Sequence, residues 1–131
     1  MVGFVIVSHG KLGKALVESA NLILGTQNDI HTISVSYLSQ NAVTIRKDII
    51  NAIDAADDGD GVVVFTDLFG GTPCNLASSL LSLKKIEVVA GVNMPMILRV
   101  LTLEPQKQYT LREVAELAKE AGQKQISIVS A

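Results

Sequence analysis

Short, continuously apolar runs alternate along the chain with amphipathic stretches of helical length. A run rich in β-branched residues is typical of a strand buried on both faces, and apolar positions three or four apart are typical of a helix. Strands are therefore predicted at residues 2–7, 30–37, 62–66 and 86–91. Helices are predicted at residues 11–24, 41–56, 95–103 and 110–121, together with one that starts near residue 72.

Capping residues and apolar faces refine this pattern. Thr72 is predicted to cap the third helix, with Pro73 as its first residue. Thr110 and Glu113 are spaced as the capping box of the last helix. Residues 124–131, KQISIVSA, have the pattern of a strand. The core-facing stripe predicted for the first helix consists of Leu12, Ala15, Leu16, Ala20 and Ile23.

The order of elements predicts an α/β fold with a flavodoxin-like, doubly wound and mainly parallel sheet, in one domain over residues 1–131. With this few strands, the expected strand order is 2-1-3-4. The first and third strands are then neighbours whose connections leave toward opposite faces, so a crevice opens beyond their carboxyl ends. His9 follows the first strand and Asp67 follows the third, so the two side chains are expected to face each other.

Composition narrows the class of protein. The 131 residues suit one domain, and 48% of them are hydrophobic, which is ample for a core. A net charge of −2 argues against a nucleic-acid partner. Cys74 is the single cysteine, which excludes an internal disulfide and a cysteine-type zinc cluster. Without a signal-peptide pattern or an apolar stretch of ~20 residues, a cytoplasmic protein is expected.

His9 is the candidate for chemistry at the predicted crevice, since His31 lies early in the second strand, away from that end. A carboxylate that accepts from Nδ1–H fixes the tautomer of an imidazole and leaves a lone pair on Nε2. Such a lone pair can attack, take a proton or bind a metal. Asp67 is the expected carboxylate.

The glycine-rich segment after Asp67 favours attack on phosphorus. Gly70, Gly71 and Thr72 precede or begin a helix, where unpaired backbone N–H groups attract a phosphoryl group. The Thr72 hydroxyl is a further donor, and Lys11 adds positive charge nearby. The predicted chemistry is a histidine that carries phosphate.

Each of these features also has a plainer structural explanation. A histidine that ends a strand is more often a hydrogen-bonded structural residue, and a Gly-Gly-Thr-Pro segment commonly marks a turn into a helix. Cys74 fits a small buried residue better than a reactive thiol. Met94 and Met96 suit either an adaptable contact surface or core filling. The convergence of His9, Asp67 and the Gly-Gly-Thr-Pro segment favours the functional interpretation.

The segments VIVSHGKLG, FTDLFGGTPCN and GVNMPM resemble, in order and spacing, the EIIA domain of the mannose-class bacterial phosphotransferase system. The resemblance runs from Met1 almost to the end of the chain. It implies that Nε2 of His9 accepts a phosphoryl group from the phosphocarrier HPr. The group then passes to a histidine of a IIB domain, which phosphorylates sugar taken up through the membrane subunits IIC and IID.

The resemblance also implies roles for individual residues and no cofactor or metal. Asp67 is the hydrogen-bond partner of His9, and Thr72 supplies a phosphate-side hydroxyl. The amides of residues 68–71 line the site. The implied partner-docking residues are Lys11, Leu68, Phe69, Asn93, Met94, Pro95 and Met96.

Members of this family pair as homodimers in which the last strand crosses to the partner's sheet, antiparallel to its neighbours. This implies a role for the QISIVS segment, whose apolar residues Ile126, Ile128 and Val129 would be buried there. The IIB domain is expected on a separate chain, or to be absent.

Other functions fit parts of the same pattern. A regulatory EIIA without a permease, or the phosphotransfer subunit of a dihydroxyacetone kinase relay, would share these motifs. A nucleotide- or flavin-binding domain is disfavoured, because the chain lacks the G-x-G-x-x-G spacing and is poor in aromatic residues. Metal-dependent hydrolysis lacks an evident third ligand.

Overall fold

A four-stranded parallel sheet forms the centre of the computed structural model, which describes residues 1–36 and 41–130. The strand order is β2-β1-β3-β4, which confirms the predicted order. The strands are β1 (Gly3–His9), β2 (His31–Val35), β3 (Val62–Thr66) and β4 (Ile86–Ala90). The last residue of the second predicted strand, Tyr37, lies outside the described residues, as does Ala131.

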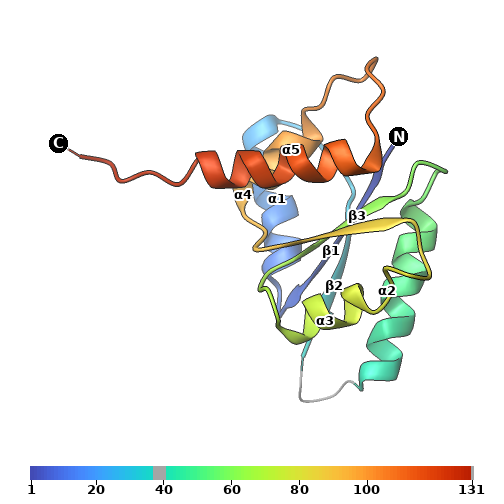
Figure 1. Ribbon diagram of the computed structural model, residues 1–131. Coiled ribbons are helices and arrows are strands. Elements are labelled where there is room, and N and C mark those ends of the chain that lie inside the picture. Colours follow the sequence, from blue (N-terminus) through green and yellow to red (C-terminus); the bar gives the residue numbers. More distant parts are fainter. Residues whose placement is uncertain (37–40, 131) are drawn as a thin grey trace.

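Helices cover both faces of the sheet (Figure 1). On one face lie α1 (Leu12–Leu24), α4 (Met94–Leu101) and α5 (Leu111–Lys124), and on the other lie α2 (Ala42–Ala56) and α3 (Thr72–Ser78). This is the doubly wound arrangement expected of right-handed crossovers between parallel strands.

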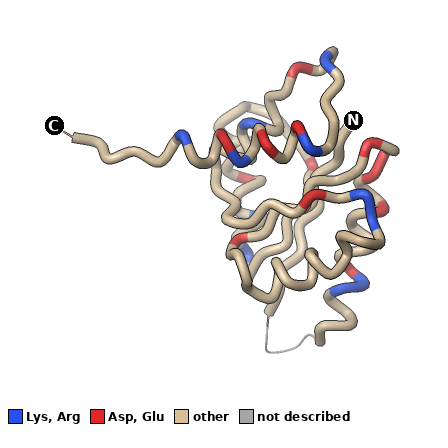
Figure 2. Tube along the Cα trace, in the orientation of Figure 1, with Lys and Arg blue, Asp and Glu red and all other residues tan. Residues whose placement is uncertain are grey.

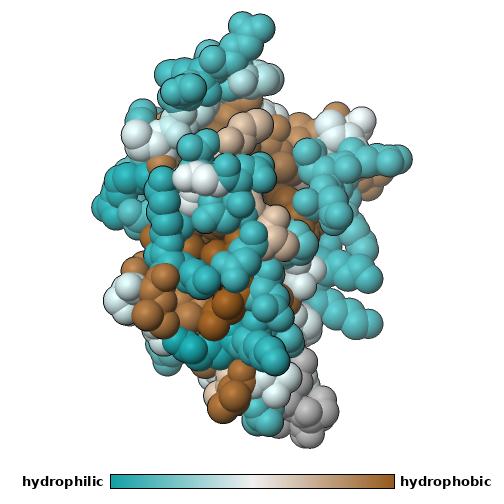
Figure 3. Space-filling view, turned by 90° about the vertical axis from the view of Figure 1, so that its right-hand side faces the viewer, coloured by the Kyte–Doolittle hydropathy of each residue, from teal (hydrophilic) through white to brown (hydrophobic). Residues whose placement is uncertain are grey.

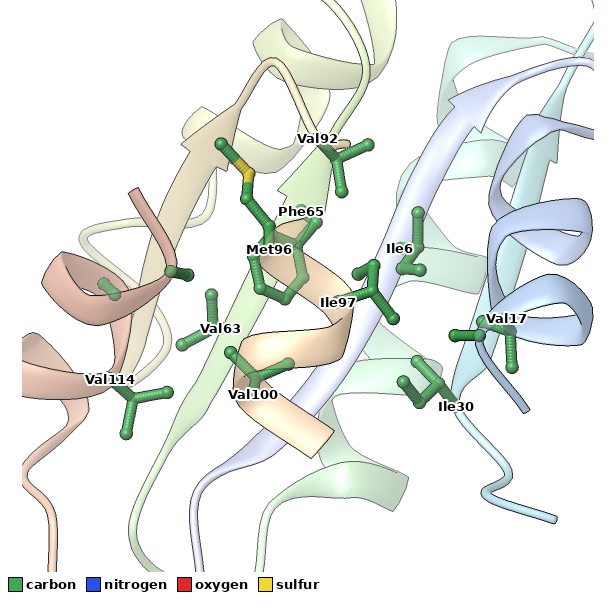
Figure 4. Packing of buried hydrophobic residues seen from close by; sticks show 13 residues of the cluster. Ile6, Val17, Ile30, Val63, Phe65, Val92, Met96, Ile97, Val100 and Val114 are labelled. Atoms are coloured by element: carbon green, nitrogen blue, oxygen red, sulfur yellow. The ribbon is translucent and has the colours of Figure 1, made fainter. Parts of the chain in front are cut away.

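The two core clusters follow the alternation of side chains along β1 and β3. Ile6 and Phe65 belong to the cluster under α1, α4 and α5, and Figure 4 shows them facing Ile97 of α4. Val5 and Val64 belong to the cluster under α2 and α3. Because successive strand residues point to opposite faces, Ser8 at the end of β1 follows Ile6 toward α1, and His9 follows Val5 toward α3.

Several helix boundaries differ from the predicted ones. The cap of α3 is Gly71, whose backbone is extended, so Thr72 is already the first helical residue instead of the cap. Asn93 caps α4, which starts at Met94 and ends at residue 101. The predicted capping box of α5 is present: Thr110 Oγ1 accepts from the Glu113 N–H, and Glu113 accepts from the Thr110 N–H.

The first helix buries only part of the predicted stripe: Ala20 is buried and Leu16 packs against the core. Leu12 and Ile23 are 44% and 60% exposed, whereas Gly13, Val17 and Ala20 are buried against the sheet. A Cβ at Gly13 would lie 2.9 Å from Cγ2 of Ile6, so the helix backbone lies close to β1 at this glycine. A hydropathy pattern cannot predict this contact, because glycine has no apolar side chain.

Residues 126–130 pair with no strand of their own chain, and α5 extends through Lys124, so the exchanged strand expected at KQISIVSA stays a prediction. The segment leaves the body of the molecule at the end of α5 (Figure 1), and its residues are exposed. A strand pattern at the end of a chain cannot be realised without a neighbouring strand to supply hydrogen bonds.

Charged residues of both signs follow one another along α5 (Figure 2). There Arg112 pairs with Glu116 at 2.8 Å. Across the described residues, no helix is both long enough and apolar enough to cross a bilayer.

Candidate active site

The carboxyl ends of β1 and β3 bring together two side chains that are 58 positions apart in the sequence. His9 is the last residue of β1, and Asp67 directly follows β3. Oδ2 of Asp67 lies 2.9 Å from Nδ1 of His9 and accepts a second hydrogen bond, also of 2.9 Å, from the backbone N–H of His9. The predicted juxtaposition of the two residues is therefore present.

This geometry determines which ring nitrogen of His9 carries the proton in the neutral imidazole. An ionised carboxylate only accepts hydrogen bonds, so the nitrogen that faces it must be Nδ1–H. The lone pair is then on Nε2, the ring nitrogen remote from Asp67. With 33% of the His9 side chain exposed, against 11% for Asp67, the imidazole is accessible while its carboxylate partner is enclosed.

The Asp67 carboxylate is maintained in its ionised form. Burial alone would raise its pKa, but the hydrogen bonds from the His9 backbone and ring, together with the charge of the ring, outweigh burial and lower the pKa below its ordinary value. The second carboxylate oxygen, Oδ1, is buried without a hydrogen-bond partner among the described residues. Oδ2 thus makes both bonds to His9.

Gly71 lies directly against the His9 ring. A Cβ added at Gly71 would be 3.2 Å from Cε1, the ring carbon between the two nitrogens. The Gly71 N–H donates to the Leu68 carbonyl at 3.2 Å, so this amide closes a turn and is not one of the unpaired N–H groups expected there. Gly70, whose φ of +81° favours glycine, completes the turn, and Thr72 is half-buried at the start of α3.

The residues expected to meet a partner protein divide into two groups. Phe69 and Leu68 are 86% and 60% exposed on the loop after Asp67, and Lys11 is exposed after the His9 turn. Large exposed apolar side chains beside a polar site are typical of a docking surface.

The second group has structural roles. Asn93 Oδ1 accepts from the Met96 N–H at 3.2 Å, and its amide donates to the Gly122 carbonyl at 3.2 Å. Met96 is 6% exposed and lies in the core (Figure 4), so the expectation that it borders a docking surface is wrong. Met94 and Pro95 are half-buried.

Other chemistries have no comparable site. Across the described ranges, no three His, Cys, Asp or Glu side chains are grouped so that they could hold a metal ion. Cys74 is buried in the first turn of α3. The pairing of His9 with Asp67, which orients an accessible imidazole, is thus the candidate active site.

Comparison with known proteins shows the family of this chain. The family model described as the PTS system fructose IIA component, EIIA-man, matches residues 3–119. The chain belongs to this family. It is therefore an EIIA component of the mannose, fructose and sorbose class of the phosphotransferase system, which confirms the resemblance seen in the sequence motifs.

Individual relatives cover nearly the whole chain. The fructose-specific EIIA component of Bacillus subtilis is 29% identical over 132 residues, covering 99% of this chain and 88% of that protein. The mannose-specific EIIAB component of Escherichia coli K12 is 30% identical over 131 residues, and the chain spans 40% of its length. The solved mannose/sorbose-specific IIA subunit of Enterococcus faecalis has a TM-score of 0.86 at 23% identity, covers 99% and 96% of the two chains, and has the same fold.

The lowered pKa of Asp67 predicts how its contribution to stability depends on pH. The ionised carboxylate favours the folded state above its ordinary pKa of 3.8, and this contribution is lost as the pH falls through the lowered value. Replacing Asp67 with Asn should lower the free energy of unfolding by about 1 kcal/mol at pH 5, and the difference should shrink toward pH 3.

Urea unfolding measured at both pH values checks this. Asp58→Asn, in the exposed turn before β3, is the matched control and should change stability little at either pH. A difference between the Asp67 variant and the original chain that grows toward pH 3 would contradict the assigned shift.

Proposed function

We propose that His9 is the phosphoryl acceptor of this EIIA component, taking the group from phospho-HPr and passing it to a histidine of a IIB domain. The observation that carries the proposal is the 2.9 Å contact between Asp67 Oδ2 and His9 Nδ1. This contact orients the imidazole so that Nε2 is the nucleophile.

The transfer exchanges one N–P bond for another. The lone pair of His9 Nε2 forms a bond to phosphorus while the bond to the donor's histidine breaks, and its electron pair stays on the donor nitrogen. The Nδ1 proton remains in the hydrogen bond with Asp67, which stabilises positive charge on the ring. Positioning and charge stabilisation supply the catalysis. Transfer to IIB is the same exchange in the opposite direction.

The residues around the ring have complementary roles in this proposal. Gly71, where a side chain would crowd Cε1, leaves room for a phosphoryl group beside Nε2. Gly70 and the Thr72 hydroxyl contribute phosphate contacts at the start of α3. Leu68 and Phe69 form the apolar part of the docking surface, and Lys11 contributes its charge. This surface would serve HPr and IIB in turn.

We propose the wider pathway that this family membership suggests. IIB would transfer the group to sugar entering through the membrane subunits IIC and IID, and the EIIA step would take place in the cytoplasm. Those other subunits, and not the EIIA component, would determine which sugar is transported.

Replacement of His9 with Ala should abolish phosphoryl transfer from purified phospho-HPr, because no other side chain presents an oriented imidazole to the crevice. His31→Ala is the matched control: this exposed histidine starts β2, where it pairs with Val5 and not with His9, and its loss should leave labelling unchanged. Intact-protein mass spectrometry at alkaline pH, where phosphohistidine survives, measures the added phosphoryl group. Full labelling of the His9 variant would overturn the assignment.

We further propose that the chain forms a homodimer in which residues 126–130 pair with β4 of the partner, antiparallel to it. Ile126, Ile128 and Val129 are 80%, 95% and 93% exposed, a pattern that a soluble chain normally covers. β4 is one of the two edge strands of the described sheet, and residues of β4 and α5 line a groove beside it. On the face seen in Figure 3, by contrast, hydrophilic side chains separate the apolar patches.

Removal of residues 126–131 should therefore convert a dimer into a monomer, because the exchanged strand supplies backbone hydrogen bonds and apolar contacts together. Multi-angle light scattering after gel filtration measures the mass. Ile128→Ser should weaken the dimer, whereas Leu22→Ser, at the 85% exposed Leu22 on α1, should not. A dimer that survives the truncation would show that another surface holds it together.

A further inference from the structure

A hydroxyl group interrupts the apolar end of β1 immediately before His9. Ser8 is 1% exposed, and the three residues before it are fully buried. A buried hydroxyl is costly unless it is hydrogen-bonded. Ser8 Oγ is bonded: it accepts from the backbone N–H of Gly13 at 2.9 Å.

This bond replaces the usual cap of α1. The residue at the cap position, Lys11, makes no side-chain hydrogen bond to the helix. Gly13 is the second residue of α1, and its N–H is one of the first-turn donors that have no acceptor within the helix. Ser8 supplies that acceptor from the strand, so the bond spans the His9 turn and joins β1 directly to α1.

The close approach of α1 to β1 depends on the same pair of residues. A Cβ at Gly13 would lie 3.3 Å from Ser8 Oγ, in addition to its conflict with Ile6. A residue larger than glycine would therefore push the helix start away from the serine. The sequence thus provides both halves of the contact, a hydroxyl before His9 and a glycine five residues later.

The peptide that follows His9 is anchored on its other side by β2. The Gly10 N–H donates to the Val35 carbonyl at 3.1 Å, and the Ser34 hydroxyl donates to the Gly10 carbonyl at 2.5 Å. With the His9 N–H bound to Asp67, the backbone around the histidine is held by three separate parts of the fold.

We propose that Ser8 is a positioning residue for phosphoryl transfer: its hydroxyl fixes the β1–α1 turn so that the His9 ring meets both Asp67 and the incoming phosphorus. Ser8 acts through His9, since strand alternation directs its side chain to the opposite face of the sheet. The inference rests on the proposed function of His9. In-line transfer is sensitive to displacements well below 1 Å, and misplacement by about 1 Å can cost about 100-fold in rate.

A hydroxyl that only caps a helix would affect stability but not kcat. The chain contains such a hydroxyl, which serves as a control. Thr110 Oγ1 accepts from the Glu113 N–H at 3.1 Å, the same type of bond in the first turn of α5. Leu111, the next residue, lies against Gly61 at the start of β3, so this cap is at the end of the sheet opposite His9. Ser8→Ala and Thr110→Ala each remove one helix-capping hydroxyl.

The test measures kcat and KM for phosphoryl transfer from phospho-HPr, with urea unfolding of each variant in parallel. Both alanine variants should unfold at lower urea concentration. We expect Ser8→Ala alone to lose about tenfold in kcat at unchanged KM, because the docking residues are intact. Ser8→Thr, which retains the hydroxyl, should recover most of the loss. Equal kcat in Ser8→Ala and Thr110→Ala, both folded, would overturn the proposal.

Two further measurements keep the test decisive. If Ser8→Ala does not fold, Ser34→Ala removes the exposed anchor of the same turn, and its kcat should fall several-fold; an unchanged kcat would contradict the positioning role. Phosphoramidate, a small donor whose N–P bond breaks with loss of ammonia, needs no partner protein. Phosphoramidate could label His9 faster in the original chain than in Ser8→Ala, while phospho-HPr labels neither protein. In that case the proposed donor is wrong and the positioning role of Ser8 stands.

Discussion

The contact between Asp67 Oδ2 and His9 governs the chemistry available to this protein. One carboxylate oxygen receives both the backbone N–H and the ring N–H of the same histidine, so the position and the tautomer of the imidazole are set together. The interaction depends on parallel neighbours, β1 and β3, whose carboxyl ends meet at one edge of the sheet. Without it, the imidazole would rotate and exchange tautomers, and the lone pair would not be held on Nε2.

Much of the fold and the centre of the site could be predicted from the sequence, because both follow from periodicity and connection rules. Uninterrupted apolar strands separated by helices require a covered parallel sheet, and its strand order places His9 beside Asp67. The capping box at Thr110 could also be predicted from the sequence, since it depends on two residues three positions apart. These features depend on local spacing and on topology.

The features that could not be predicted depend on contacts between distant backbone segments. The buried stripe of α1 includes Gly13, which a hydropathy pattern ignores, and Gly71 rather than Thr72 caps α3. Met96 fills the core beside Gly122, where a Cβ would be 2.6 Å from its methyl group. The role of Ser8 was not apparent either; its one signal in the sequence is a hydroxyl at the end of an otherwise apolar strand.

The tautomer of His9 in the unphosphorylated protein tests the central claim most directly. The chemical shifts of the two ring nitrogens, measured by NMR on ¹⁵N-labelled protein at neutral to mildly alkaline pH, report which one carries the proton in the neutral ring. The Asp67 contact predicts a protonated Nδ1 and a lone pair on Nε2. A ring protonated on Nε2, or one that averages between both forms, would contradict the account.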